Sequence, residues 1–207
     1  MDGVDYRFES DRSFFPEVIE TERLRLERLA SDTVGLFELY EFLGGDPVGE
    51  ETDHLQWEPH ATPMETKRLL EQFEKLWHDG EQASYLLRPT GSEEAGELAG
   101  ISTLSVEWDR RVAELGIFLH ERFWGREYSA ERARAMLGLA FESLDLEVVE
   151  VDCSTENERA KRAIEKYVDE HGGEYLGMRY NSITREAGDP MDSHVYAITR
   201  EQFQGPD

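Results

Sequence analysis

Lysine is scarce in this chain: four residues, Lys67, Lys75, Lys161 and Lys166, are the whole complement. Acidic residues outnumber basic ones by 46 to 22, so the formal net charge is −24. A nucleic-acid partner is therefore disfavoured, because binding a phosphate backbone needs basic patches. An acidic surface attracts cationic partners. Acid spread along a lysine-poor chain also suits molar salt, where charges are screened within about 3 Å. We favour the second interpretation and expect a halophilic microbe as the source.

Cysteine and long apolar runs are also nearly absent. Cys153 is the single cysteine, which excludes an internal disulfide and fits a cytoplasmic protein. We expect no membrane span and no export signal, since neither pattern is present. The six histidines lack ligand spacing, so no metal site is expected. The length fits a single domain over residues 18–207, preceded by a polar, flexible arm over residues 1–17.

The segment from residue 112 to residue 144 organises the rest of the chain. Residues 112–119 form a short apolar run typical of a buried strand. Ser129 opens a helix whose apolar residues recur every three or four positions, at Ala133, Met136, Leu137, Ala140, Phe141 and Leu144. Gly125 lies in the turn between strand and helix. A helix after such a turn directs free N–H groups and a positive dipole end toward it, which suits phosphate. An ordinary strand-to-helix turn is equally compatible with the pattern.

The spacing Arg122-x-x-Gly125-x-Glu127 resembles the pyrophosphate loop of the GNAT acetyltransferases, Gln/Arg-x-x-Gly-x-Gly/Ala. The flanking segments are similar to the ribosomal-protein (RimJ/RimL-like) branch of that family. Glu127 departs from the pattern, which has Gly or Ala at this position. A carboxylate that pointed inward here would repel a pyrophosphate. The resemblance implies that acetyl-CoA is bound by the end of the central strand and by this loop, at Phe118, Leu119, Arg122, Phe123, Trp124, Gly125, Arg126, Glu127, Tyr128 and Ser129.

Two helices are expected before the central strand. Ser31 is expected to cap the first, and Gly44-Gly45 to end it. Thr62-Pro-Met-Glu65 predicts the start of the second, with Thr as N-cap, Pro at the first helical position and Glu closing a capping box. Gly80 is expected to end it.

Alternating or short apolar segments predict the strands. They lie at residues 22–27, 85–87, 97–106, 112–119, 147–153, 174–180 and 195–199. This order also resembles the GNAT order. We therefore predict an α/β GNAT fold, a mixed and mostly antiparallel central sheet that is flanked by helices and splayed at the acetyl-CoA site.

The segment after the central helix carries a second group of candidates. Cys153 falls on the buried face of its strand and is expected to be a core residue. Asn157 is a good helix N-cap, and it also resembles the GNAT asparagine that hydrogen-bonds the pantetheine arm. Many GNAT enzymes have a tyrosine acid seven residues after this asparagine, where this chain has Ile164. Tyr167 lies on the same apolar side, and we interpret it first as a core residue.

A loop over residues 44–62 contains Trp57, Glu58 and His60. Loops of this length in compact domains are usually functional or disordered, and the aromatic content argues against simple disorder. In GNAT enzymes this region covers the acceptor site. A surface excursion with Trp57 packed on the body is nearly as compatible with the sequence.

Glu114 is the candidate catalytic base. It shares a strand face with Gly116 and Phe118, an unusual place for a carboxylate unless it lines a cleft. An ion-paired residue at a strand edge is the alternative interpretation.

The resemblance implies an N-acetyltransferase that moves an acetyl group from acetyl-CoA to a primary amine, most simply a protein N-terminal α-amine. Two alternatives stay open: a small-molecule acetyltransferase that uses a polyamine or antibiotic, and a non-catalytic acyl-CoA-binding module. The resemblance also allows a homodimer.

Overall fold

The computed structural model describes residues 7–9, 14–44, 59–91, 93–184 and 189–203. Its strands form one sheet in the order β1-β2-β3-β4-β5-β6-β7-β9-β8. The strands are β1 (Arg7–Glu9), β2 (Val18–Glu20), β3 (Leu24–Arg28), β4 (Gln82–Pro89), β5 (Gly100–Glu107), β6 (Val112–Leu119), β7 (Val148–Ser154), β8 (Glu174–Ile183) and β9 (Met191–Thr199). The helices are α1 (Leu36–Gly44), α2 (Pro63–His78), a 3-10 turn η1 (Glu121–Phe123), α3 (Tyr128–Gly138), its π-helical extension η2 (Leu139–Ser143) and α4 (Glu158–Glu170).

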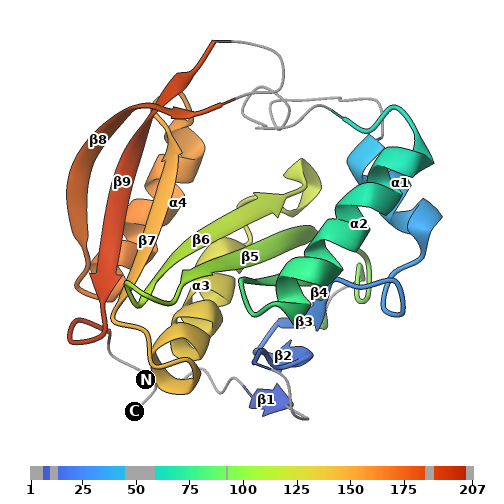
Figure 1. Cartoon of the computed structure of the whole chain (residues 1–207), viewed down its shortest axis with the longest axis horizontal. Coiled ribbons are helices and arrows are strands. Elements are labelled where there is room, and N and C mark those ends of the chain that lie inside the picture. The colour runs from blue at the N-terminus through green and yellow to red at the C-terminus, as the bar shows by residue number, and fades with distance from the viewer. Residues whose placement is uncertain (1–6, 10–13, 45–58, 92, 185–188, 204–207) are drawn as a thin grey trace.

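The sheet parts at its centre. Neighbouring strands are antiparallel except for β6 and β7, which run parallel and pair only from Val112↔Val148 to Glu114↔Glu150. Beyond that point β6 continues beside β5 as far as Leu119, whereas β7 continues beside β9 as far as Ser154. Figure 1 shows the two strands diverging from their paired ends. This confirms the predicted mixed, mostly antiparallel and splayed sheet.

Helices cover both faces of the sheet, with α1 and α2 on one side and α3 and α4 on the other (Figure 1). The larger core lies under α3 and α4. It includes the predicted apolar face of the central helix, where Ala133, Met136, Leu137, Ala140 and Phe141 are buried. A smaller core under α1 and α2 contains Leu29, Leu39, Leu43, Leu70, Leu86 and Ile101. The observed layers therefore follow the periodicity of the sequence.

The start of α2 agrees with the sequence prediction, whereas the start of α1 does not. The predicted start of α2 is confirmed: the Glu65 carboxylate accepts from the Thr62 N–H at 3.3 Å and from the Ala61 N–H at 2.7 Å. The predicted cap of α1 is wrong, because that helix begins at Leu36. The N–H of Ser31 donates instead to Glu74 of α2 at 2.7 Å. The hydroxyl of Thr33 closes a separate turn by accepting from the Ala30 N–H at 3.1 Å.

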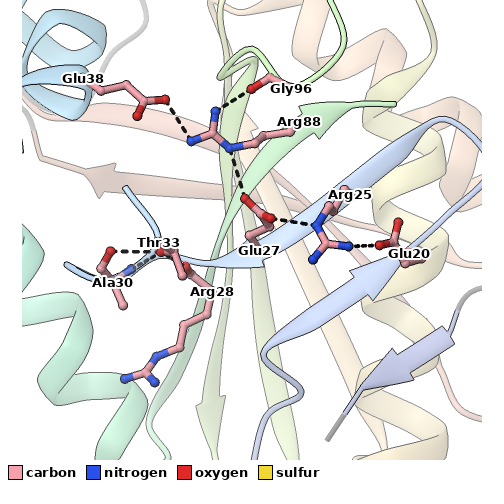
Figure 2. A network of polar contacts seen from close by, with 9 residues as sticks. All are labelled: Glu20, Arg25, Glu27, Arg28, Ala30, Thr33, Glu38, Arg88 and Gly96. Atoms are coloured by element: carbon pink, nitrogen blue, oxygen red, sulfur yellow. Dashed lines mark hydrogen bonds and ion pairs between the residues drawn. The ribbon is translucent and has the colours of Figure 1, made fainter. Parts of the chain in front are cut away.

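A polar network joins α1 to the N-terminal strands (Figure 2). Glu27 of β3 accepts from Arg25 at 2.7 Å and from Arg88 of β4 at 3.1 Å. Arg88 also pairs with Glu38 of α1 at 2.9 Å and donates to the Gly96 carbonyl at 2.7 Å. Because the Arg88 side chain is only 13% exposed, this network fixes α1 and the β4–β5 connection better than isolated surface pairs would.

Part of the N-terminal arm contacts the body of the protein. Residues 7–9 form β1, which pairs with β2. Phe15 is buried and packs edge-on against Trp77 at 5.2 Å between ring centroids. These described parts differ from the loose arm expected from their polar sequence, because one buried aromatic ring and a strand ladder hold them. The division into an arm (1–17) and one domain (18–207) stays a prediction.

Candidate active site

A cavity of about 840 Å³ lies where β6 and β7 part. Its walls are residues 114–118 of β6, residues 151–154 of β7 and the inner face of α4. Residues 59–61 and one side of α2 close it from the opposite face of the sheet, and Ser129 of α3 reaches it. The splay therefore produces an opening in the sheet that reaches from the start of α3 to the side of α2.

The turn before α3 has the geometry of an anion cradle. Gly125 has φ +73°, and a Cβ placed on it would meet no described atom within 4 Å. The first turn of α3 leaves backbone N–H groups without intrahelical partners, and its positive dipole end faces the turn. The indole N–H of Trp124 donates to the Leu119 carbonyl at 2.7 Å, which ties the turn to the end of β6. Phe123 is buried beneath it. The turn fits a pyrophosphate.

The charged side chains of the turn face other parts of the protein. Arg122 pairs with Glu97 at 2.7 Å, and Arg126 makes two bonds to Glu94, at 3.0 and 3.1 Å. Glu127 forms an ion pair with Lys166 of α4, which lowers the pKa of the Glu127 carboxyl. Its carboxylate therefore has a cationic partner on α4. Tyr128 is buried at the start of α3.

Sequence reasoning missed a clamp behind this turn. Glu131 of α3, whose side chain is 6% exposed, accepts from the Thr21 hydroxyl at 2.6 Å and from the Arg23 side chain at 2.7 Å. Arg23 also donates to the Arg126 carbonyl at 3.0 Å. The start of β3 thus holds the turn, although more than a hundred residues separate the partners. No local pattern could have revealed it, because each of these residues looks like an ordinary surface polar residue in sequence.

Asn157 and the inner face of α4 form the other wall. The side chain of Asn157 caps α4 by accepting from the Ala160 N–H at 2.9 Å, and the residue also lines the cavity. Ile164 and Tyr167 are buried and line the cavity as well. Cys153 is buried, and burial raises the pKa of its thiol to about 12, so it is a poor nucleophile. The core positions predicted for Cys153 and Tyr167 are confirmed.

Glu114 lies at the mouth of the cavity on β6. Desolvation raises the pKa of its carboxyl, the nearby Asp152 carboxylate raises it further, and Arg179 opposes the change. Asp152 of β7 also lines the cavity. Neither carboxylate forms an ion pair with a described residue, whereas the adjacent Glu150 pairs with Arg179 at 3.0 Å. A carboxyl group with a raised pKa beside a cleft suits proton transfer near neutral pH.

The two strand residues expected to bind the cofactor differ in their backbone surroundings. Phe118 stands opposite Ile101 of β5 in the ladder, and its ring packs edge-on against Phe42 of α1 at 5.5 Å. The His120 N–H donates to the Ala99 carbonyl at the end of β5. Backbone N–H and C=O groups point to alternate sides of a strand from one residue to the next. Those of Phe118 therefore point toward β5, and those of Ile117 and Leu119 point toward the gap. The Leu119 carbonyl there already accepts from Trp124.

The side of the cavity expected to receive the acceptor is lined by the residues before α2 and by α2 itself. Trp57 and Glu58 lie outside the described residues. His60, from the end of the predicted loop, lines the cavity, and its Nδ1 is 2.8 Å from the Thr66 hydroxyl of α2. Arg68 and Glu65 of α2 line the same side. Within the described ranges, no cluster of three metal-ligating side chains occurs, and no helix is long and apolar enough to cross a membrane.

Solved structures share this architecture. A provisionally assigned acetyltransferase from T. thermophilus is 27% identical, with a TM-score of 0.68 over 91% of this chain and 92% of that one. A provisionally assigned ribosomal-protein-serine acetyltransferase from Vibrio cholerae is 18% identical, with a TM-score of 0.69 over 88% and 97%. A spermidine N-acetyltransferase from Vibrio cholerae, solved with CoA and spermine, is 18% identical, with a TM-score of 0.67 over 86% and 96%. The last two likenesses show the fold alone.

The family of the chain follows from a match to a family model over most of its length. No curated protein matches the chain. The family model described as the acetyltransferase (GNAT) domain matches residues 23–167, which is more than half of the 207 residues. The match spans the turn at Gly125, the parted strands and most of α4. The chain therefore belongs to the GNAT acetyltransferase domain family.

Proposed function

We propose that this protein is an N-acetyltransferase that transfers the acetyl group of acetyl-CoA to a primary amine, in the first place a protein N-terminal α-amine. The observation that carries the proposal is the cavity at the parting of β6 and β7. It joins a phosphate-suited helix start near Ser129 to the carboxylate of Glu114, which forms no ion pair with a described residue. A two-substrate acyl transfer needs both features in one cleft.

The residues at the splay fit acetyl-CoA. The backbone N–H groups around Gly125 and the start of α3 would hold the pyrophosphate, with Ser129 beside them. The backbone of Ile117 and Leu119 faces the gap and would pair with the pantetheine arm, while Phe118 contributes its ring to the wall. The amide nitrogen of Asn157 would donate to the same arm, because its oxygen is used in capping. When bound, acetyl-CoA supplies the activated acetyl group.

Glu114 would act on the amine. An amine attacks only when it is neutral, so a lysine-like amine with a pKa near 10.4 needs a base, whereas an α-amine near 7.7–8.0 needs little help. Glu114 would accept the amine proton directly or through a water. The Ile117 N–H, at the open edge of β6, would donate to the carbonyl oxygen as it gains negative charge.

A small cationic amine is the second candidate acceptor. It is favoured by the Glu114 and Asp152 carboxylates, which line one cavity mouth without a cationic partner among the described residues. The spermidine enzyme named above shares the fold. The RimJ/RimL-like assignment, halophilic source, cytoplasmic location and homodimer stay predictions from the sequence. A non-catalytic acyl-CoA-binding module is the remaining alternative.

Two measurements in molar salt test the proposal. Acetyl-CoA at a hundredfold excess over Kd should stabilise the fold by about 2.7 kcal/mol, measured as a raised melting temperature. Release of free thiol should then depend on an added amine, with peptide and polyamine acceptors compared. An unchanged melting temperature would contradict cofactor binding. Binding without thiol release on any amine would support the non-catalytic module.

A further inference from the structure

The core beneath the cleft contains a cation without a counter-charge. Arg132 of α3 is 0% exposed and is among the largest fully buried side chains. One of its terminal nitrogens donates to the Gly116 carbonyl of β6 at 3.3 Å, and its Nε has no hydrogen-bond partner among the described residues. Within the same ranges, no carboxylate pairs with the guanidinium. Arg88 shows the contrast, because its partly buried guanidinium pairs with both Glu27 and Glu38. A buried charge without such compensation is costly.

A phenol with an unsatisfied hydroxyl lies close to this cation. Tyr167 of α4 is 1% exposed and lines the cavity, and its hydroxyl has no hydrogen-bond partner among the described residues. The helix α4 packs against α3, and Tyr167 and Arg132 act on each other electrostatically. Buried donors in native proteins have partners as a rule. The Arg132 Nε–H and the Tyr167 hydroxyl therefore call for an acceptor that the described residues do not supply.

The surroundings of the two donors select the kind of acceptor. The buried side chains of Val151, Cys153 and Ile164 line the cavity beside Tyr167. They are apolar apart from the Cys153 thiol, which stays neutral because burial raises its pKa to about 12. One cationic donor, one neutral donor and apolar walls suit an anion of a single charge that gives up its hydration easily. A phosphate or sulfate would bring a second charge without a partner.

We propose that Arg132 and Tyr167 bind a halide ion, with chloride as the natural ligand, at the inner end of the cleft. The Arg132 Nε–H and the Tyr167 hydroxyl would both donate to the ion, whose charge would compensate that of the buried guanidinium. The bond to the Gly116 carbonyl holds the guanidinium against β6 while its Nε serves the ion. This inference goes beyond the proposed function and is independent of it, because it uses no group assigned there to the amine or to acetyl-CoA.

The charges around the site agree with an anion at this place. Burial lowers the pKa of Arg132 to about 10, so the guanidinium is still charged near neutral pH. Burial raises the pKa of Tyr167 to about 12, so the phenol keeps the proton that it donates. Glu114 and Asp152 line the same cavity, and their carboxylates repel anions. We therefore assign the ion to the space between α3 and α4, and a halide bound beside these carboxylates would contradict the assignment.

The test is the chloride dependence of stability. The protein is unfolded with urea near neutral pH in mixtures of potassium chloride and potassium methanesulfonate at constant, molar ionic strength. Once chloride exceeds its Kd, we expect the unfolding equilibrium constant to fall about tenfold for each tenfold rise in chloride, as for one ion bound only by the folded state. Tyr167→Phe should weaken chloride binding at least about tenfold, because it removes a hydrogen bond to a charged ligand. Arg132→Met should abolish the dependence.

Two matched variants serve as controls. Arg134→Met removes an arginine of α3 that is partly exposed and pairs with Glu170, and Tyr196→Phe removes the hydroxyl of a buried tyrosine that donates to Glu165 at 3.1 Å. Both should keep the chloride dependence of the wild type. In methanesulfonate alone, Arg132→Met should be at least as stable as the wild type, because it removes an uncompensated buried charge.

Bromide replaces chloride in a crystal to locate the ion by its anomalous X-ray scattering, which should lie between the Arg132 and Tyr167 side chains. Stability that does not respond to chloride in the wild type would overturn the inference, and so would an unchanged response in Tyr167→Phe. The tyrosine variant loses a single oxygen atom, so it decides the matter even if Arg132→Met does not fold.

Discussion

The carboxylate of Glu127 pairs with the ammonium group of Lys166, 39 residues further along the chain. Glu127 has φ +63°, the left-handed conformation that glycine adopts most easily. This explains in physical terms why the related loops have a small residue here. The sequence had suggested that the Glu127 carboxylate could repel the pyrophosphate. The structure argues against this, because the carboxylate has a cationic partner on α4 and is mostly exposed.

Glu127→Gly tests this arrangement. We expect the free energy of unfolding to rise, because glycine adopts φ +63° without strain, and the affinity for acetyl-CoA to change by less than about fivefold. Chemical denaturation and calorimetric titration measure the two effects. Lys166→Met is the control that removes the ion pair and keeps the strain. A gain in affinity of about tenfold or more, about 1.4 kcal/mol, would show that the carboxylate opposes the cofactor.

Gly125→Val should abolish acetyl-CoA binding and leave the protein folded. The position has open space around it, so the cost to the fold is that of a left-handed side chain, about 1–2 kcal/mol. The new side chain would occupy the place where backbone must approach phosphate. Gly172→Val is the matched control, since Gly172 has φ +68° and lies between α4 and β8. Equal affinities in the two variants would contradict the anion cradle.

Glu114→Gln should lower kcat more than it raises KM. General-base catalysis contributes about 10²–10⁴-fold, and the loss should approach this range with a polyamine and be smaller with an α-amine peptide. Because the pKa of Glu114 is raised, the acid limb of the kcat profile should lie above the usual carboxyl range and disappear in the variant. Glu142→Gln is the control, because Glu142 is exposed in η2 and does not line the cavity. If the dependence of kcat on pH is unchanged in Glu114→Gln and only the free energy of unfolding falls, the role of Glu114 is purely structural.

His171 should make the fold sensitive to mild acid. It is 4% exposed, and burial lowers its pKa to about 4 from an unfolded value of 6.5. The unfolded chain therefore binds more protons between these values, so stability is complete above about pH 6.5 and falls toward pH 4, by up to about 3 kcal/mol. His171→Leu should flatten this part of the profile in denaturation curves. His78→Leu, at an exposed position of α2, should leave it unchanged.

The sequence by itself determined the features that local patterns encode. The capping box at Thr62 and Glu65, the apolar face from Ala133 to Phe141 and the glycine turn at Gly125 all depend on residues within a few positions of one another. Such features follow from backbone geometry and side-chain period, so reading along the chain was enough. The order of strands and helices around them then indicated the fold class.

Only the tertiary structure decided what surrounds each side chain. It turned Glu127 toward Lys166, joined Thr21 and Arg23 to Glu131, and buried Arg132 beside Tyr167. These partners are distant in sequence, and a charged residue carries no local mark of the cation, carboxylate or phenol it will meet. Electrostatic energy depends on the distances between charges and on their burial, and both are set only when the chain folds. The interactions of the charged residues in this cleft therefore could not be predicted from their positions in the sequence.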